Sequence, residues 1–159
     1  MIKITLITLG KLKEKYLREA SAEYEKRLSR YCKLDIVEIE PVRLSEKPSQ
    51  NEIDLALQKE SEMIIKKIPA GSKVYSLCVE GKQLSSEEFA KRNDGIFSQG
   101  GSATFIIGSS YGLDESIKRL SDFRLSLSAM TFPHQLFRVM LLEQIYRSFK
   151  INEGSTYHK

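Results

Sequence analysis

The chain has 159 residues, with 41% apolar residues, 29% charged residues and a net charge of +4. This length and composition fit one domain with a core of its own and exclude an intrinsically disordered chain. No apolar run approaches the roughly 18 residues that span a bilayer, and the first residues read as a strand instead of a secretion signal, so we expect a cytoplasmic protein that forms one domain over residues 1–159.

Strand and helix patterns alternate along the first half of the chain. Apolar runs predict strands at Ile2–Leu9 and Leu34–Ile39, and helical spacing predicts helices at Glu14–Tyr31 and Ser49–Lys67. A proline-containing loop at residues 41–51 separates the second strand from the second helix. Ser49, followed three residues later by Glu52, predicts a capping box at the start of the second helix.

The second half continues the alternation. It predicts strands at Val74–Val79, Ala103–Ile107 and Phe123–Leu127, and helices at Ser85–Arg92, Asp114–Leu120 and His134–Phe149. Strands and helices in this order are typical of an α/β fold with a mostly parallel sheet flanked by helices on both faces.

Two joints between a strand and a helix could form a ligand pocket. Gly108–Gly112 follows a buried strand, and glycines there let the backbone approach a ligand closely. At the second joint, Ser126–Thr131 is rich in small and hydroxyl residues before Pro133, and Thr131 or an intervening residue could cap the last helix. Ordinary strand-to-helix turns have the same patterns, but two such joints at neighbouring strand ends would build one pocket.

The last helix has apolar residues on opposite sides. Leu142, Ile145 and Phe149 share one side, whereas Leu136 and Met140 fall on the other. A helix that is apolar nearly all round is buried on more than one side. In a domain of this size, we expect the second side to contact a partner subunit.

Three charged residues of the same helix allow two interpretations. Arg138 lies within the apolar arc, so it either pairs with a carboxylate of its own fold or faces a phosphate or carboxylate in a cleft between subunits. Glu143 and Arg147 have the spacing of an ion pair on a helix surface.

The C-terminal quarter carries the excess charge and both histidines. Residues 118–159 hold seven Lys and Arg against three Asp and Glu, and the chain ends in Tyr157, His158 and Lys159. A basic face suits a polyanion such as RNA, and the tail could stack on a base and contact a phosphate. A solvated surface without a partner and a disordered chain end are the alternative interpretations.

Cys32 and Cys78 lie outside any C-x-x-C spacing, which indicates buried free thiols and no structural zinc site.

Motifs spread over the whole chain carry a resemblance to a known family. They are Leu9–Lys13, Glu23–Leu28, Phe105–Gly108, Leu125–Ser128, Met130–Gln135, Arg138, Glu143–Arg147 and Tyr157–Lys159. In this combination the chain resembles the RlmH family of small bacterial SPOUT methyltransferases, which methylate N3 of a pseudouridine in large-subunit (23S) ribosomal RNA. The stretch from Leu125 to Arg147, together with the Tyr-His end, is the most specific part.

The resemblance implies a SPOUT-type α/β fold with a C-terminal deep trefoil knot. It places the knot near residues 105–135 and the last helix and tail at residues 134–159. It implies a homodimer that binds S-adenosylmethionine, needs neither metal nor membrane, and acts on ribosomal RNA within the ribosome. The cofactor contacts carried over by position are Leu77, Gly108, Leu127, Ser128, Ala129, Met130, Thr131 and Phe132. Family members usually have a second glycine where this chain has Ser109.

The reaction that the resemblance implies also needs a base or a stabiliser of the developing anion, and contacts that position the RNA, which residue types near the pocket could provide. His158 is the candidate base for the N3 proton, with Tyr157 and Arg138 as further catalytic residues. His134, Arg147 and Lys159 are assigned to RNA binding. Two rival functions are a nucleotide-binding enzyme such as a dehydrogenase, which the absence of G-x-G-x-x-G disfavours, and a non-catalytic RNA-binding module. Binding of S-adenosylmethionine separates these alternatives.

Overall fold

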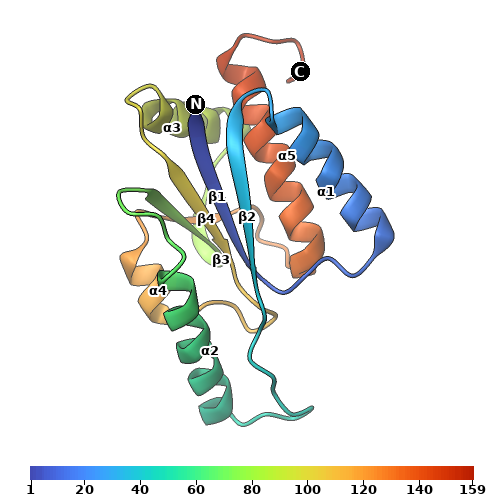
Figure 1. Ribbon diagram of the computed structural model, residues 1–159, viewed down its shortest axis with the longest axis vertical. Coiled ribbons are helices and arrows are strands. Elements are labelled where there is room, and N and C mark those ends of the chain that lie inside the picture. The colour runs from blue at the N-terminus through green and yellow to red at the C-terminus, as the bar shows by residue number, and fades with distance from the viewer.

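A five-stranded sheet forms the centre of the computed structural model, which describes residues 1–159 (Figure 1). The strand order is β2-β1-β4-β3-β5, and every neighbouring pair is parallel. The strands are β1 (Ile2–Leu9), β2 (Cys32–Ile39), β3 (Lys73–Gln83), β4 (Ala103–Ile107) and β5 (Phe123–Ser126). The predicted α/β fold with a parallel sheet is confirmed.

Helices cover both faces of the sheet. They are α1 (Lys15–Leu28), α2 (Gln50–Ile65), α3 (Ser86–Phe97), α4 (Glu115–Leu120) and α5 (His134–Asn152). The helix α5 packs against both α1 and α3, whereas α2 contacts α4, and Figure 1 shows α1 beside α5 with α2 and α4 set apart from them. Alternate strand residues face separate cores: Leu6 and Phe105 belong to the first, and Ile7 and Ile106 belong to the second. Burial on both faces explains why these strands are continuous apolar runs.

Local capping sets several helix boundaries. The predicted capping box is present: the Ser49 side chain accepts the Glu52 amide, and the Glu52 carboxylate accepts the Ser49 amide. Ser85 caps α3 in the same way, but α3 continues to Phe97, beyond the predicted end at Arg92. Of the two alternatives for the start of α5, the structure shows an intervening residue, since the N-cap is Pro133 and not Thr131, and no side chain caps that end.

The strand β3 leaves the ladder in its middle and then returns. Leu77 and Lys82 both pair with Leu125, so residues 78–81 form a bulge. The predicted strand Val74–Val79 therefore ends too early, because β3 continues past Gly81 to Gln83. A Cβ atom on Gly81 would lie 2.8 Å from the carbonyl oxygen of Arg124, so the residue must be glycine for the bulge to lie against β5. The bulge supplies one wall of the cavity described next.

Candidate cofactor and substrate site

A cavity of about 650 Å³ opens at the carboxyl ends of β3, β4 and β5. This edge of an open parallel sheet is where ligands bind in α/β proteins. Both strand-to-helix joints singled out in the sequence line it, although β3 lies between the two strands. The lining residues are 77–80, 107–113, 118, 126–128, 130–134 and 137.

The turn after β4 is held by two glycines. Gly112 has a φ of +87°, in the left-handed region, and its amide donates to the Ser109 carbonyl at 2.9 Å. A Cβ atom on Gly108 would lie only 2.3 Å from the carbonyl oxygen of Gly112. Gly108 is thus required by the closure of the turn itself, a constraint that the expectation of close approach to a ligand did not include.

The loop before α5 is also organised by its own polar groups. The Ser126 hydroxyl donates to the Ser128 carbonyl at 2.9 Å, and the Met130 amide donates to the Ser128 hydroxyl at 2.9 Å. Of the residues assigned to the cofactor, Ala129 is the one that does not line the cavity. The loop therefore presents the large apolar residues Leu127, Met130 and Phe132 to the cavity together with small and hydroxyl residues.

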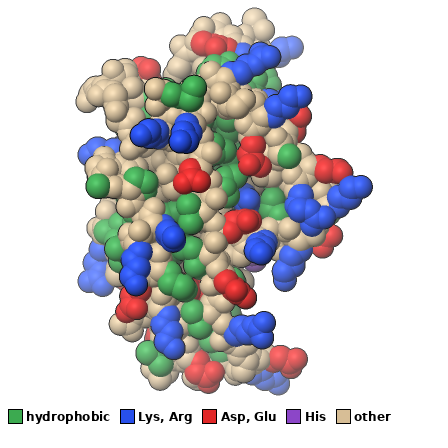
Figure 2. Space-filling model, in the orientation of Figure 1, with side chains coloured by type: hydrophobic (Ala, Val, Ile, Leu, Met, Phe, Trp, Pro, Cys, Tyr) green, Lys and Arg blue, Asp and Glu red, His purple; other side chains and the backbone are tan.

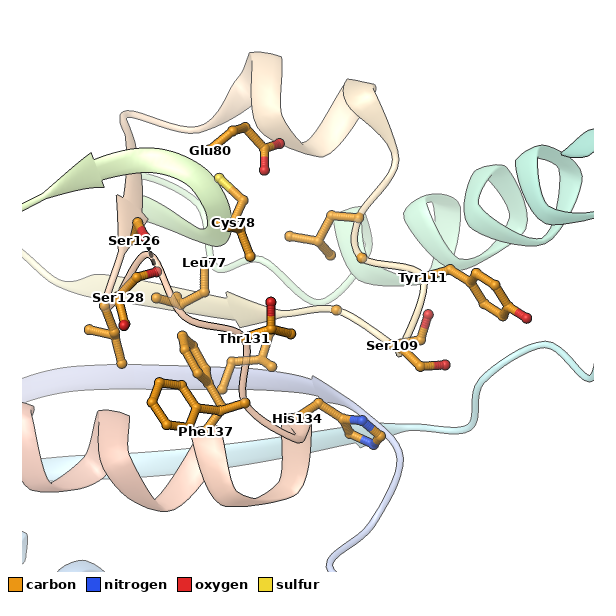
Figure 3. A pocket seen from close by; sticks show the side chains of 18 of the residues that line it. Leu77, Cys78, Glu80, Ser109, Tyr111, Ser126, Ser128, Thr131, His134 and Phe137 are labelled. Atoms are coloured by element: carbon orange, nitrogen blue, oxygen red, sulfur yellow. Dashed lines mark hydrogen bonds between the residues drawn. The ribbon is translucent and has the colours of Figure 1, made fainter.

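The charges around the cavity are mostly neutralised. Lys118 forms a hydrogen bond with Glu80, and this contact lowers the pKa of Glu80. Burial, with a smaller effect of Lys13, lowers the pKa of His134 below its usual value, so its imidazole is neutral at pH 7. Figure 3 shows Ser109, Tyr111 and His134 at one end of the cavity, away from Glu80.

The C-terminal tail folds back onto α5 and α3. The Tyr157 hydroxyl donates to Glu143 Oε1 at 3.1 Å, and the Tyr157 ring meets the Tyr146 ring edge-on, with 5.1 Å between centroids. Arg147 Nη1 lies 3.1 Å from His158 Nδ1, and His158 Nε2 lies 2.6 Å from a carboxylate oxygen of α3. The expected Glu143–Arg147 ion pair is present at 2.7 Å. This cluster of Glu143, Arg147, Tyr157 and His158 is called the tail cluster below.

The tail cluster and the cavity lie at opposite parts of α5. His134 at the start of the helix lines the cavity, and Arg147 follows 13 residues later. At 1.5 Å per residue, this separation is about 20 Å along the helix axis. Within one chain, the structure therefore does not bring the predicted catalytic residues Tyr157 and His158 to the predicted cofactor residues.

Comparison with known proteins decides the family. A family model described as "Predicted SPOUT methyltransferase" matches residues 2–158. The chain belongs to the SPOUT methyltransferase family. It is 53% identical to a protein of Bifidobacterium adolescentis and 48% identical to one of Acetivibrio thermocellus, in both cases over 99% of this chain and 100% of the relative. It is 50% identical to one of Clostridium acetobutylicum over 98% and 99%.

Each of these relatives is named ribosomal RNA large subunit methyltransferase H, which confirms the resemblance seen in the sequence. Among solved structures, a methylase family protein from Haemophilus influenzae Rd KW20 aligns with a TM-score of 0.56 and 12% identity, over 99% of this chain and 70% of that one. This likeness supports the fold of the SPOUT methyltransferase and nothing further.

Arg138 of this SPOUT methyltransferase has a partner within its own fold. Its Nη1 donates to Glu38 Oε2 on β2 at 2.7 Å, and the residue is 7% exposed. Its Nε has no hydrogen-bond partner, and the residue lines a small cavity next to Gly10 and His134. Of the two interpretations of Arg138, the structure shows the ion pair with a carboxylate of its own fold.

The expected basic face is largely neutralised in the SPOUT methyltransferase. Of the seven Lys and Arg in residues 118–159, five form ion pairs: Lys118, Arg124, Arg138, Arg147 and Lys150. Figure 2 shows blue and red side chains interspersed over the face in view, with no large patch of one sign. Any contact with a polyanion thus depends on local groups more than on net charge.

Both cysteines are unbridged. Cys32 and Cys78 are free thiols, as expected, but Cys78 is only half-buried, and burial raises the pKa of both. No three His, Cys, Asp or Glu side chains gather as metal ligands would. None of the helices has the length and apolar character to cross a membrane.

Proposed function

We propose that this chain transfers a methyl group from S-adenosylmethionine to N3 of a pseudouridine in 23S ribosomal RNA, on the assembled ribosome and hence in the cytoplasm. The observation that carries the proposal is family membership over nearly the whole chain, together with relatives named as ribosomal RNA large subunit methyltransferases. The cavity at the sheet edge supports it, because it offers a site for the methyl donor in the position where α/β enzymes bind ligands.

The cavity fits the proposed cofactor in size and lining. Its volume of about 650 Å³ lies within the range of small-molecule sites, and apolar walls suit an adenine ring. Leu77, Gly108, Leu127, Ser128 and the run Met130–Phe132 would hold the cofactor, which supplies a methyl group already activated on a sulfonium. The predicted trefoil knot near residues 105–135 belongs to this proposal, and the meeting of loops 108–112 and 127–133 at one cavity supports it.

The protein's own task is to orient the acceptor base and remove the N3 proton. We assign removal of the N3 proton to His158. Its two ring nitrogens contact Arg147 and Glu87 in this structure, so one of these contacts must open before the ring can accept the proton. Burial raises the pKa of Tyr157, so this side chain stays protonated and can donate a hydrogen bond or stack on a base. Arg138 acts as a positioning residue, because it ties α5 to β2 next to the cavity. His134, Arg147 and Lys159 remain the proposed RNA contacts.

A homodimer would bring the two halves of the site together. On α5, Leu136 is exposed, and Met140 lines a groove of about 270 Å³ with Leu127. Met130, in the loop before α5, is 74% exposed. Packing of these residues against a second copy would cover apolar surface and could place each tail cluster at the partner's cavity.

The proposal is tested by methyl transfer from radiolabelled S-adenosylmethionine. The substrates are whole ribosomes, isolated large subunits and free 23S RNA from a strain that lacks the modification. We expect label in the ribosome sample, at a single pseudouridine that mass spectrometry identifies as methylated at N3. Incorporation at another nucleotide would overturn the assigned substrate, and the absence of both incorporation and cofactor binding would overturn the enzymatic function.

A further inference from the structure

A second cavity, of about 220 Å³, adjoins the proposed cofactor cavity. The two share Ser109, Ser110, Tyr111 and His134, so they meet at the turn that follows β4. Its other walls come from Leu9 at the end of β1, from the β2–α2 loop and from α2. They are apolar, with one exception: Glu60. Figure 3 shows Ser109 and His134, two of the shared residues, at one end of the large cavity.

Glu60 is a buried carboxylate without a cation. It is 4% exposed, and none of the ion pairs of the structure includes it. Its Oε2 accepts the Val42 amide at 3.0 Å, and its Oε1 accepts the Ser109 hydroxyl at a long 3.5 Å. A carboxylate in such surroundings is costly unless a cation or a proton compensates it, and burial accordingly raises the pKa of Glu60.

The proposed function does not use this group. The β3 bulge, the loop 108–112, the loop before α5 and the start of α5 line the cofactor cavity, and the tail cluster is proposed to provide the proton chemistry. A carboxylate that lines the adjoining cavity can bind a cationic end of a molecule that lies mainly in the large cavity. No Lys or Arg lines the second cavity, and its one histidine, His134, is neutral at pH 7. The protein thus provides an anionic group there and no cation to pair with it.

We infer that Glu60 binds the α-ammonium group of the amino-acid end of the methyl donor, an inference that rests on the proposed function. The donor's adenosine would occupy the large cavity, and its amino-acid end would pass Ser109 into the second one. An ammonium donates charge-assisted hydrogen bonds, which are about twice as strong as neutral ones. The Ser109 hydroxyl contacts Oε1, so the serine at the position of the family's usual second glycine helps to orient this carboxylate.

The test separates the ammonium contact from a structural role of Glu60. Glu60→Gln removes the charge but keeps both hydrogen bonds, since its carbonyl can accept the Val42 amide and its NH₂ can donate to Ser109. The matched control is Glu62→Gln, two residues away on α2 and exposed. Calorimetry measures the binding of S-adenosylhomocysteine, which has no sulfonium, and of its analogue that lacks only the α-amino group.

We expect Glu60→Gln to weaken the binding of S-adenosylhomocysteine about tenfold or more and to leave the binding of the desamino analogue unchanged. Glu62→Gln should change neither. Equal weakening of both ligands would show that Glu60 only holds the loops together and would overturn the inference. Equal affinity of the wild-type protein for the two ligands would also overturn the inference, although the proposed function would still stand. If the wild-type protein binds neither ligand, both proposals fall.

Discussion

Deletion of Tyr157, His158 and Lys159 should abolish methyl transfer at a small cost in stability. The deleted residues make two contacts through Tyr157, the hydroxyl bond to Glu143 and the edge-on packing on Tyr146, and His158 adds contacts with Arg147 and Glu87, which solvent screens. The two Tyr157 contacts together amount to about 2 kcal/mol. In a domain of this size, a loss of about 2 kcal/mol lowers the melting temperature by about 4–8 °C. The truncated protein should therefore fold at room temperature.

The same deletion should reduce methyl transfer at least about a hundredfold, because it removes the proposed base and the side chain that would stack on the acceptor. Cofactor binding, measured by calorimetry, should stay within about threefold, since the tail lies about 20 Å along α5 from its own cavity. Deletion of Lys159 alone is the control for a shortened end. Activity retained by the longer deletion would refute the role of the tail, and a melting temperature lowered by much more than about 8 °C would indicate a structural role instead.

Mixed dimers test whether the site is shared between chains. A tail-deleted subunit lacks the proposed base, and a Gly108→Val subunit has a deformed cofactor turn, since the added side chain meets the Gly112 carbonyl. A heterodimer of the two retains one complete site only if each tail serves the partner's cavity. Activity recovered on mixing supports the shared site. An inactive heterodimer, with both subunits folded by circular dichroism, would indicate that one chain builds the whole site.

Three further outcomes follow from the structure. Gly108→Ala should lose cofactor binding and lower the melting temperature, because its Cβ would lie 2.3 Å from the backbone oxygen of Gly112. The control Gly95→Ala in α3, whose Cβ would meet nothing within 4 Å, should stabilise the protein by about 0.5–1 kcal/mol. Equal effects of the two substitutions would contradict the tight turn at Gly108. Leu136→Asp combined with Met140→Asp should yield a monomer by analytical ultracentrifugation at micromolar concentration, and a wild-type monomer would refute the dimer. Finally, burial raises the pKa of Glu60 above its ordinary 4.5, so the folded state binds that proton more tightly than the unfolded chain. The free energy of unfolding of the wild-type protein, measured with urea, should then fall as pH rises from 4.5 through the raised pKa. Glu60→Gln should remove this fall, and a fall that persists in the variant would exclude Glu60 as its cause.

Local sequence signals predicted most of the elements because each depends on neighbouring residues. The strand Ile2–Leu9 and the capping box of Ser49 and Glu52 are present as expected. Errors fall where long-range pairing overrides local signals. Gly81 normally would end a strand, yet β3 resumes its pairing with β5 beyond it, because a glycine there lets a bulge lie against the neighbouring backbone.

The candidate site divides in the same way. Motif spacing alone predicted that the residues around Gly108 and Thr131 lie at strand ends, since the carboxyl ends of parallel strands meet at one sheet edge. No local pattern distinguishes Glu60 from the other carboxylates of α2, because its burial depends on the Val42 amide and on Ser109, far away in the sequence.

The charges show most clearly what the sequence determined and what the tertiary structure decided. The amino-acid sequence by itself determined the alternating elements, the parallel α/β class, the family and an excess of positive charge after residue 118. Only the tertiary structure decided that Arg138 pairs with Glu38, 100 residues away, and that the tail lies beside Glu143 instead of the cavity. Periodicity acts over a few residues, whereas an ion pair or a cavity depends on how distant segments pack.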